Sequence, residues 1–410
     1  MMGRFCRYID KVFHFGEQLR TLTDRRQRPQ IPTEAVFASA FTMFATNRKS
    51  LNGLEKEIRM PSHLRGIVGS RLPSVDSVGR VYGLLDREPL EQMLSTINHR
   101  VRRNKSLGET GRLLIAAVDG HEFFSSRKRC CAECQTRTVQ VGDESVTEYY
   151  HQGVVCHLIG HELALPLDVE LLRPGEGEET AAKRLLERVF ANYSRFVDVV
   201  AGDALYLNAP FINFCLEHHK HAIVVVKGDQ RLLLQDAQGL FSQQTPGEWQ
   251  FAGRRVRYWD QEGFTSAEGV ETPLRVLHTE ETIRRRERVA GQWQTKETES
   301  SWYWATTLTK KQLGTGETYR AGHDRWDVEN DCFNVLSTHW AMDHCFKHEP
   351  HAIANFVLTC FIAFVLLQCF WRGNLKPRRR TIISTLIGLA EELYRSLGPK
   401  CHAPWLAKPP

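Results

Sequence analysis

The stretch Leu113-Leu114-Ile115-Ala116-Ala117-Val118-Asp119-Gly120 decides the fold that this sequence predicts. Six apolar residues in a row, followed by an acidic residue and a glycine, are typical of a strand that is buried on both faces and ends in a carboxylate. Strands of this kind occur in sheets that helices cover on both sides. The stretch therefore predicts an α/β domain in which Asp119 stands at the carboxyl end of a central strand.

The segments after this strand alternate between apolar runs and helical periodicity. We expect, in this order, strands at 149–159 and 163–172, a helix capped by Thr180, a strand at 196–201 that ends in Gly202-Asp203, a helix at 209–218 and a strand at 222–226. Two strand ends thus carry an aspartate. The order predicts a mixed sheet with flanking helices.

The remaining segments predict further parts around this sheet. Residues 106–228 and 306–375 would form the catalytic domain, 229–305 a β-rich insertion of short strands, and 376–410 a basic C-terminal helix and tail. Residues 1–105 read as helices joined by arginine-rich loops. We predict that this N-terminal helical domain binds DNA ends, although a plain helical bundle fits the same pattern.

After the insertion, a long helix is expected from about 319 to 346. One face of it carries residues spaced 3, 4, 3 and 4 apart, namely Trp326, Glu329, Phe333, Leu336 and Trp340. Glu329 would interrupt an otherwise apolar seam. Any one acid could be a surface residue, but Glu329 held against a sheet that presents Asp119 and Asp203 would complete a three-carboxylate site for Mg²⁺, which takes oxygen ligands.

The charge distribution favours a polyanionic partner. The chain has 54 Lys and Arg against 48 Asp and Glu, a net charge of +6, and the basic residues gather at 25–28, 100–105, 127–129, 254–257, 284–286 and 378–380. Each cluster alone can be a solvated surface, but six of them can neutralise phosphates and release counterions. We expect Arg254, Arg255 and Arg257 to contact DNA.

Eleven scattered cysteines and an N-terminus without an apolar leader stretch predict a reduced cytosolic protein. Cys131 and Cys134 form a CxxC pair that could supply half of a zinc site with His151, Cys156 or His157. Because no second CxxC or spaced histidine pair is present, free thiols are favoured over zinc.

Residues 353–371 form an apolar run of 19 residues, long enough to cross a bilayer of ~30 Å. Asn355, Thr359 and Gln368 lie within it. We expect a buried helix that packs on the catalytic sheet. A membrane-tethered protein is the alternative, and recovery only with detergent would support it.

The acidic motifs resemble those of DDE transposases of bacterial insertion sequences. The matching stretches are VDGHE at 118–122, VAGDA at 200–204 and RWDVEN at 325–330. The strand order and the β-rich insertion are similar to the subgroup with a Tyr-x2-Arg-x3-Glu-x6-Lys signature. Only Arg-x3-Glu is intact, because Gly322 stands at the Tyr position and Leu336 at the Lys position.

The resemblance implies an RNase H-like catalytic domain in which Asp119, Asp203 and Glu329 are catalytic and hold two Mg²⁺ ions ~3.5–4 Å apart. Mn²⁺ can substitute. Arg325 would pair with Glu329 or contact a phosphate. The implied activity is cleavage of transposon-end DNA and strand transfer into target DNA.

The resemblance further implies that double-stranded DNA, both the terminal inverted repeats and the target, is the partner and that a homodimer forms in the DNA complex. It implies a cytoplasmic protein of a prokaryotic cell that joins the nucleoid when active, with no membrane. The alternative is a catalytically inactive or recruited transposase-derived protein that only binds DNA. A metal-dependent cleavage assay on terminal repeats separates the two.

Overall fold

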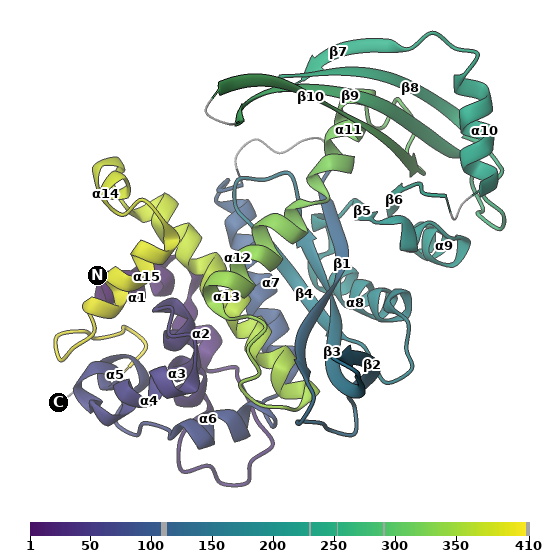
Figure 1. Ribbon diagram of the computed structural model, residues 1–410. Coiled ribbons are helices and arrows are strands. Elements are labelled where there is room, and N and C mark those ends of the chain that lie inside the picture. Colours follow the sequence, from purple (N-terminus) through teal and green to yellow (C-terminus); the bar gives the residue numbers. More distant parts are fainter. Residues whose placement is uncertain (108–112, 229–230, 252, 290–291, 407–410) are drawn as a thin grey trace. The chain divides into compact units, whose positions relative to one another are not determined.

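The computed structural model describes residues 1–107, 113–228, 231–251, 253–289 and 292–406 (Figure 1). The chain forms two compact units. The larger unit contains Met1–Thr110, Gly120–Phe196 and Asp327–Pro410, and the smaller unit contains Gly111–Asp119 and Val197–Trp326. The domain limits predicted from the sequence divide the chain differently and stay a prediction; one of them, at 229, falls outside the described residues.

The first hundred residues of the larger unit are helical, as predicted. The helices are α1 (Met2–Phe13), α2 (Phe15–Leu19), α3 (Thr33–Ala45), α4 (Leu51–Arg59), α5 (Pro61–Val68), α6 (Val75–Tyr82) and α7 (Arg87–Arg103). Asp86 precedes α7 and Pro89 lies in its first turn, where proline costs no hydrogen bond. Thr33 is the first helical residue of α3 rather than its cap, which is Pro32.

The core of the larger unit surrounds α13 (Pro350–Asn374), whose apolar window is entirely buried inside the protein. It packs on α3, α7 and the strand β4 (Leu165–Leu171). Its polar side chains bond to specific partners: the Asn355 amide donates to the Tyr82 carbonyl at 2.9 Å, and Gln368 bonds the N–H and C=O of Ala164 at 3.0 and 2.9 Å. The prediction of a buried helix is therefore confirmed. Helices α14 (Pro377–Ile382) and α15 (Leu386–Arg395) follow it.

The strands of the larger unit are β2 (Gln135–Val141), β3 (Glu144–Leu158), β4 and the later part of β1 (Ile115–Ser126). Strand β3 pairs in antiparallel with β2 and β4 and is hydrogen-bonded to β1. The two strands predicted at 149–159 and 163–172 are β3 and β4. Helix α8 (Glu178–Tyr193) begins after Gly177, so Thr180 lies in its first turn and is not its cap, contrary to the prediction.

The smaller unit is built on the first residues of β1, which pair in parallel with β5 (Val199–Gly202), and β5 in turn pairs in parallel with β6 (His221–Val225). Helix α9 (Ala209–Glu217) connects the last two strands, as expected. The pairings β4-β3-β1 in the larger unit and β1-β5-β6 in the smaller unit form a mixed sheet with flanking helices. The predicted α/β class with an RNase H-like sheet is confirmed.

The β-rich insertion is more regular than the sequence predicts. It contains a helix, α10 (Arg231–Phe241), that was not expected, and four strands, β7 (Gly247–Phe251), β8 (Arg254–Phe264), β9 (Leu274–Val289) and β10 (Gln292–Thr306). These strands are antiparallel neighbours in the order β10-β9-β8-β7, and β10 pairs with β6. The insertion therefore extends the sheet of the smaller unit and does not form short separate pieces.

The prediction of one long helix over 319–346 is wrong. The chain forms α11 (Thr315–Asp324) in the smaller unit, and then a π-helical segment (Val328–Phe333) and α12 (Asn334–Trp340) in the larger unit. A turn at 325–326 ends α11, and the left-handed Ala341 (φ 55°) ends α12. In π-helical geometry hydrogen bonds join residues five apart, so the spacing that predicts one face of an α-helix does not hold here.

Candidate active site

Asp119 on β1 and Asp203 directly after β5 occupy equivalent positions relative to these two neighbouring parallel strands. Ala117 on β1 is in register with Ala201 on β5, and each aspartate lies two residues further along its strand. Side chains two residues apart on a strand point to the same face, and neighbouring strands lie about 4.8 Å apart. This register places both aspartates just beyond the last paired residues, although β1 continues to Ser126 and does not end at Asp119 as the sequence predicts; their convergence on one site stays a prediction.

Local contacts orient the Asp203 side chain. Its Oδ1 accepts a hydrogen bond of 2.8 Å from the Leu205 N–H and so caps the short 3-10 helix Ala204–Tyr206. Gly202 precedes it because the Tyr206 ring packs against the backbone there: a Cβ at residue 202 would lie 2.8 Å from Tyr206 Cδ2. Asp203 therefore stands on a turn that fixes one carboxylate oxygen.

Asp119 is paired with Arg325, the arginine that follows α11. Arg325 Nη1 lies 3.2 Å from Asp119 Oδ2, and their side chains are 8% and 18% exposed. Within the smaller unit the Arg325 guanidinium is bound to Asp119, and its pairing with Glu329, which lies in the larger unit, stays a prediction. A positive charge next to this carboxylate stabilises its ionised form.

Glu329 belongs to the larger unit, in the π-helical segment, and its side chain is exposed. The second half of the predicted apolar face is buried, namely Phe333, Leu336 and Trp340. The first half is not, because Trp326 is 42% exposed. Single π-helical turns within α-helices are frequent at functional sites. An exposed carboxylate on such a segment is accessible to a ligand, so Glu329 stays a candidate for a reason different from the seam.

His121 and Glu122 follow Asp119 on β1, and both have partners in the larger unit. His121 Nε2 lies 2.6 Å from Asp343 Oδ1, and its ring stacks on Phe333 with the centroids 4.4 Å apart. Glu122 forms an ion pair of 2.6 Å with Arg137. His121 therefore attaches β1 to the π-helical segment and to the residues after α12.

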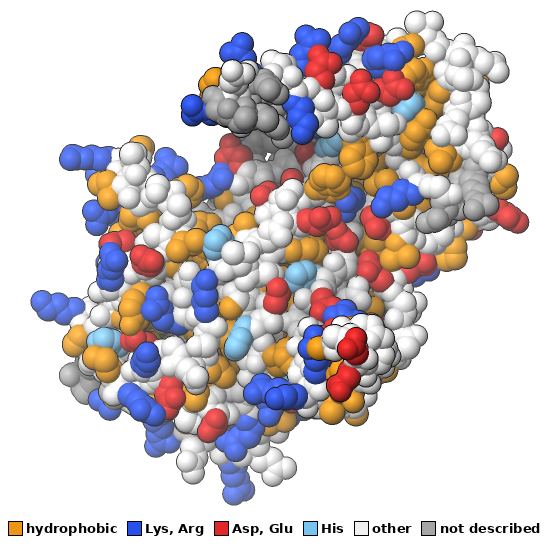
Figure 2. Space-filling model, viewed as in Figure 1, with side chains coloured by type: hydrophobic (Ala, Val, Ile, Leu, Met, Phe, Trp, Pro, Cys, Tyr) orange, Lys and Arg blue, Asp and Glu red, His pale blue; other side chains and the backbone are white. Residues whose placement is uncertain are grey.

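The arginines of β8 are paired with acidic residues on the neighbouring strands. The ion pairs are Arg254–Glu281 (2.8 Å), Arg255–Glu248 (2.9 Å) and Arg257–Glu280 (2.8 Å). Figure 2 shows blue and red side chains interleaved over strands β7 to β10. The charges on this surface largely neutralise each other. Contact of Arg254, Arg255 and Arg257 with DNA stays a prediction, and their ion pairs with glutamates do not favour it.

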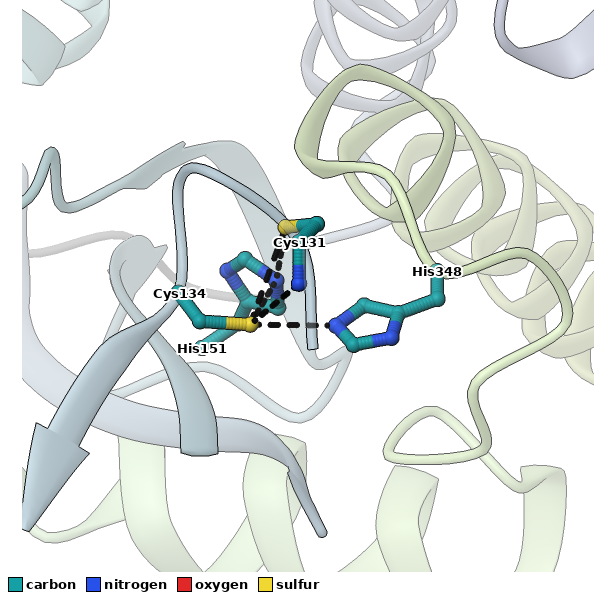
Figure 3. A group of neighbouring side chains, drawn as sticks. All are labelled: Cys131, Cys134, His151 and His348. Atoms are coloured by element: carbon teal, nitrogen blue, oxygen red, sulfur yellow. Dashed lines mark hydrogen bonds between the residues drawn. The ribbon is translucent and has the colours of Figure 1, made fainter. Parts of the chain in front are cut away.

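A group of cysteine and histidine side chains lies elsewhere in the larger unit. Cys131, Cys134, His151 and His348 have ligand atoms within 4.8 Å of one another (Figure 3). Burial lowers the pKa of the His151 imidazole to about 4, so this ring is neutral at pH 7. The sequence suggested the CxxC pair and His151 but missed His348, which is 214 residues from Cys134 and follows no recognisable spacing.

One comparison with known proteins places the chain in a family. The family described as "Transposase DDE domain" matches residues 134–366, more than half of the chain. The chain belongs to this transposase family. No curated protein matches it. The matched range of the transposase domain contains Asp203, Arg325 and Glu329 but begins after Asp119. The assignment of Asp119 to the site is therefore supported by the register of β1 with β5 and not by the family match.

The structure explains two departures of this transposase from the subgroup signature, at Gly322 and at Leu336. Gly322 on α11 is buried, and a Cβ there would lie 2.4 Å from Trp304 Cε2 on β10. No side chain fits between the helix and this ring. Leu336, at the position of the signature lysine, is fully buried, where a lysine would need a partner for its charge.

Gly322→Ala is expected to destabilise the smaller unit by about 1–3 kcal/mol, the usual cost of overpacking a filled core. Gly316→Ala is the matched control, because residue 316 lies in the same helix with no atom within 4 Å of the added Cβ. That change should be neutral or stabilising by up to about 1 kcal/mol, since alanine is the better helix former. Urea unfolding followed by tryptophan fluorescence measures both. Equal midpoints for the two variants would contradict the packing account.

Proposed function

We propose that this protein is an active DDE transposase that cuts the ends of its own element and joins them to target DNA. Asp119, Asp203 and Glu329 are the proposed catalytic residues and metal ligands. Double-stranded DNA with terminal inverted repeats and the target duplex are the substrates, and a homodimer holds the paired ends. The protein acts in the cytoplasm of a prokaryotic cell, at the nucleoid.

The observation that supports this proposal most is the register of two aspartates in a chain of the transposase DDE family. Asp119 and Asp203 each lie two residues beyond the pair Ala117–Ala201 on adjacent parallel strands. Two aligned carboxylates repel each other unless a cation or hydrogen bonds compensate them. Here the Arg325 guanidinium compensates Asp119 and the Leu205 N–H compensates one oxygen of Asp203, and a bound cation would compensate both carboxylates together.

The residues fit Mg²⁺ by their chemistry. All three are carboxylates, the oxygen ligands that this cation prefers, and Asp119 already pairs with a cationic group, the Arg325 guanidinium. Bound Mg²⁺ would supply Lewis-acid activation of the attacking oxygen and stabilisation of the leaving oxygen. Arg325 would then be available to bind a phosphate oxygen of the DNA, and the Leu205 N–H would keep Asp203 oriented.

The exposed basic helix α14 is a further candidate for DNA contact. Arg378 and Arg379 are exposed, and among the described residues no acidic side chain forms an ion pair with them or with Arg380. Where Figure 1 labels α14, Figure 2 shows Lys and Arg side chains at the surface. Unpaired surface arginines can neutralise phosphates, whereas those of β8 are already bound to glutamates.

DNA affinity is expected to fall steeply with salt, and α14 should account for part of that dependence. Replacing Arg378, Arg379 and Arg380 with Ala should reduce the slope of log affinity against log salt by about 2–3, because each lost phosphate contact removes about 0.9. The double variant Arg255→Ala with Arg257→Ala is the comparison and should reduce the slope of log affinity against log salt by a smaller amount. Gel shifts on a terminal-repeat duplex at several salt concentrations measure the slopes. Affinity that does not change with salt would count against DNA as the partner.

The proposal itself is tested by cleavage. A labelled duplex that carries the inverted repeat flanking the reading frame should be cut by the purified protein in Mg²⁺ or Mn²⁺ and left intact in chelator. Specific binding without cleavage in either metal would support the alternative, a transposase-derived protein that only binds DNA.

A further inference from the structure

The cysteine and histidine group in the larger unit comes from three separate segments of the chain. Cys131 and Cys134 lie in the loop between β1 and β2, His151 lies on β3, and His348 lies between α12 and α13. Figure 3 shows the two sulfur atoms and the two rings directed toward a common centre. His151 is buried, and the other three side chains are partly buried.

We propose that Cys131, Cys134, His151 and His348 bind one Zn²⁺ ion in a closed, structural site. Two thiolates and two imidazoles are a ligand set that selects zinc with tetrahedral geometry. On binding, the two thiols each release a proton to solvent and the imidazoles bind through Nε2, so the site carries no net charge. No oxidant or reductant is involved.

The distances between the ligand atoms match the edges of such a tetrahedron. With bonds of ~2.3 Å to sulfur and ~2.0–2.1 Å to nitrogen, two sulfurs lie ~3.8 Å apart and a sulfur and a nitrogen ~3.5 Å apart. The two Sγ atoms are 3.6 Å apart, and His151 Nε2 lies 3.4 and 3.5 Å from them. His348 Nε2 lies 3.2 Å from Cys134 Sγ. These four distances are those expected between ligands of one tetrahedral ion.

Two neighbouring features agree with a metal and not with a disulfide. The Sγ–Sγ distance of 3.6 Å far exceeds the ~2.05 Å of a disulfide bond. The backbone N–H of Cys131 donates to Cys134 Sγ at 3.3 Å, a contact that stabilises a thiolate. Because all four positions are protein ligands, no open site for a substrate remains, and the ion would be structural.

The ion would attach the residues after α12 to the β-strands of the larger unit. His348 belongs to the same connection as Asp343, which is bound to His121 on β1 at 2.6 Å. The π-helical segment and α12 precede this connection directly. Zinc would thus hold in place the part of the larger unit that carries the segment 328–340. The inference does not depend on whether the protein cuts DNA.

The test is the metal content and the cobalt spectrum of the full-length protein. Purified from zinc-supplemented cells, it should contain about one zinc per chain. After exchange with Co²⁺ it should show the intense visible bands of a tetrahedral ion and a thiolate charge-transfer band in the near ultraviolet. Wild-type protein without zinc and without this spectrum would overturn the proposal, as would a Cys131–Cys134 disulfide found by mass spectrometry before reduction.

Variants identify the ligands. Cys134→Ser should lower the zinc content at least about tenfold, the loss expected on removal of a metal ligand. Cys130→Ser is the matched control, because Cys130 is exposed, adjoins Cys131 and is outside the group. His348→Cys should retain the metal and strengthen the thiolate-to-cobalt band, which a merely structural histidine would not do. An unchanged cobalt spectrum in His348→Cys, or equal zinc loss in Cys130→Ser and Cys134→Ser, would overturn the assignment.

Discussion

Asp203→Asn is expected to reduce cleavage of a terminal-repeat duplex by about 10³-fold or more, as the loss of one member of a catalytic unit does. This change is conservative for the fold, because an asparagine oxygen can accept the hydrogen bond that Asp203 takes from the Leu205 N–H at 2.8 Å. Loss of activity would therefore report the lost negative charge at a metal ligand and not a misfolded turn.

Asp119→Asn should have a similar effect on cleavage, and the double variant should lose little more than either single one, since ligands of one metal site act as a unit. Asp119→Asn also removes the ion pair with Arg325, so Asp203→Asn is the cleaner of the two. Asp236→Asn, an exposed acid on α10, is the control and should cut at the normal rate. Additive losses in the double variant would argue that the two aspartates act separately.

Arg275→Met is expected to destabilise the smaller unit by about 3–5 kcal/mol, because breaking a buried ion pair leaves an uncompensated charge. Arg275 on β9 is 1% exposed and Asp260 on β8 is 3% exposed, with Nη2–Oδ2 and Nε–Oδ1 distances of 2.6 and 2.8 Å. Arg275 also donates to the Leu313 carbonyl at 2.6 Å. This side chain therefore joins the insertion to the segment before α11.

Replacing both partners, Arg275→Met with Asp260→Leu, should recover most of that loss, since no charge stays buried without a partner. Urea unfolding followed by tryptophan fluorescence is the measurement. It reports mainly the smaller unit, whose tryptophans include Trp249, Trp259, Trp302 and Trp304. If Arg275→Met lowers the free energy of unfolding by less than about 1 kcal/mol, the ion pair does not contribute to stability as its burial implies.

The sequence predicts the central sheet well because each of its elements carries a local signal. The predicted segments 196–201, 209–218 and 222–226 correspond to β5, α9 and β6 within one to three residues. Apolar runs of this length that end at glycine have few other structures open to them. The placement of Asp119 and Asp203 two residues beyond the pair Ala117–Ala201 follows from the parallel pairing of β1 with β5. No local pattern shows this pairing, but the α/β order of the elements favours it.

The parts that the sequence misses depend on contacts distant in the chain. The outer halves of β9 and β10 are rich in charged and polar residues, and those whose side chains are described are mostly exposed, with cross-strand pairs such as Arg284–Glu297 at 2.5 Å. No apolar periodicity therefore marks these segments as long strands. The π-helical segment changes the spacing on which the glutamate seam was predicted. His348 joins its group only through folding. For the long strands and for His348 the partner lies on another element.

The central claim, that three carboxylates bind the catalytic metal, is tested most directly by Glu329→Gln beside Asp331→Asn. Both residues are exposed and lie in the same π-helical segment, and both changes remove one negative charge with little change in shape. Cleavage of the labelled terminal-repeat duplex in Mg²⁺ and a gel shift on the same duplex would be measured for each. The account predicts that Glu329→Gln binds normally but cuts about 10³-fold more slowly or worse, while Asp331→Asn cuts normally. A Glu329→Gln protein that cuts at the wild-type rate would contradict it.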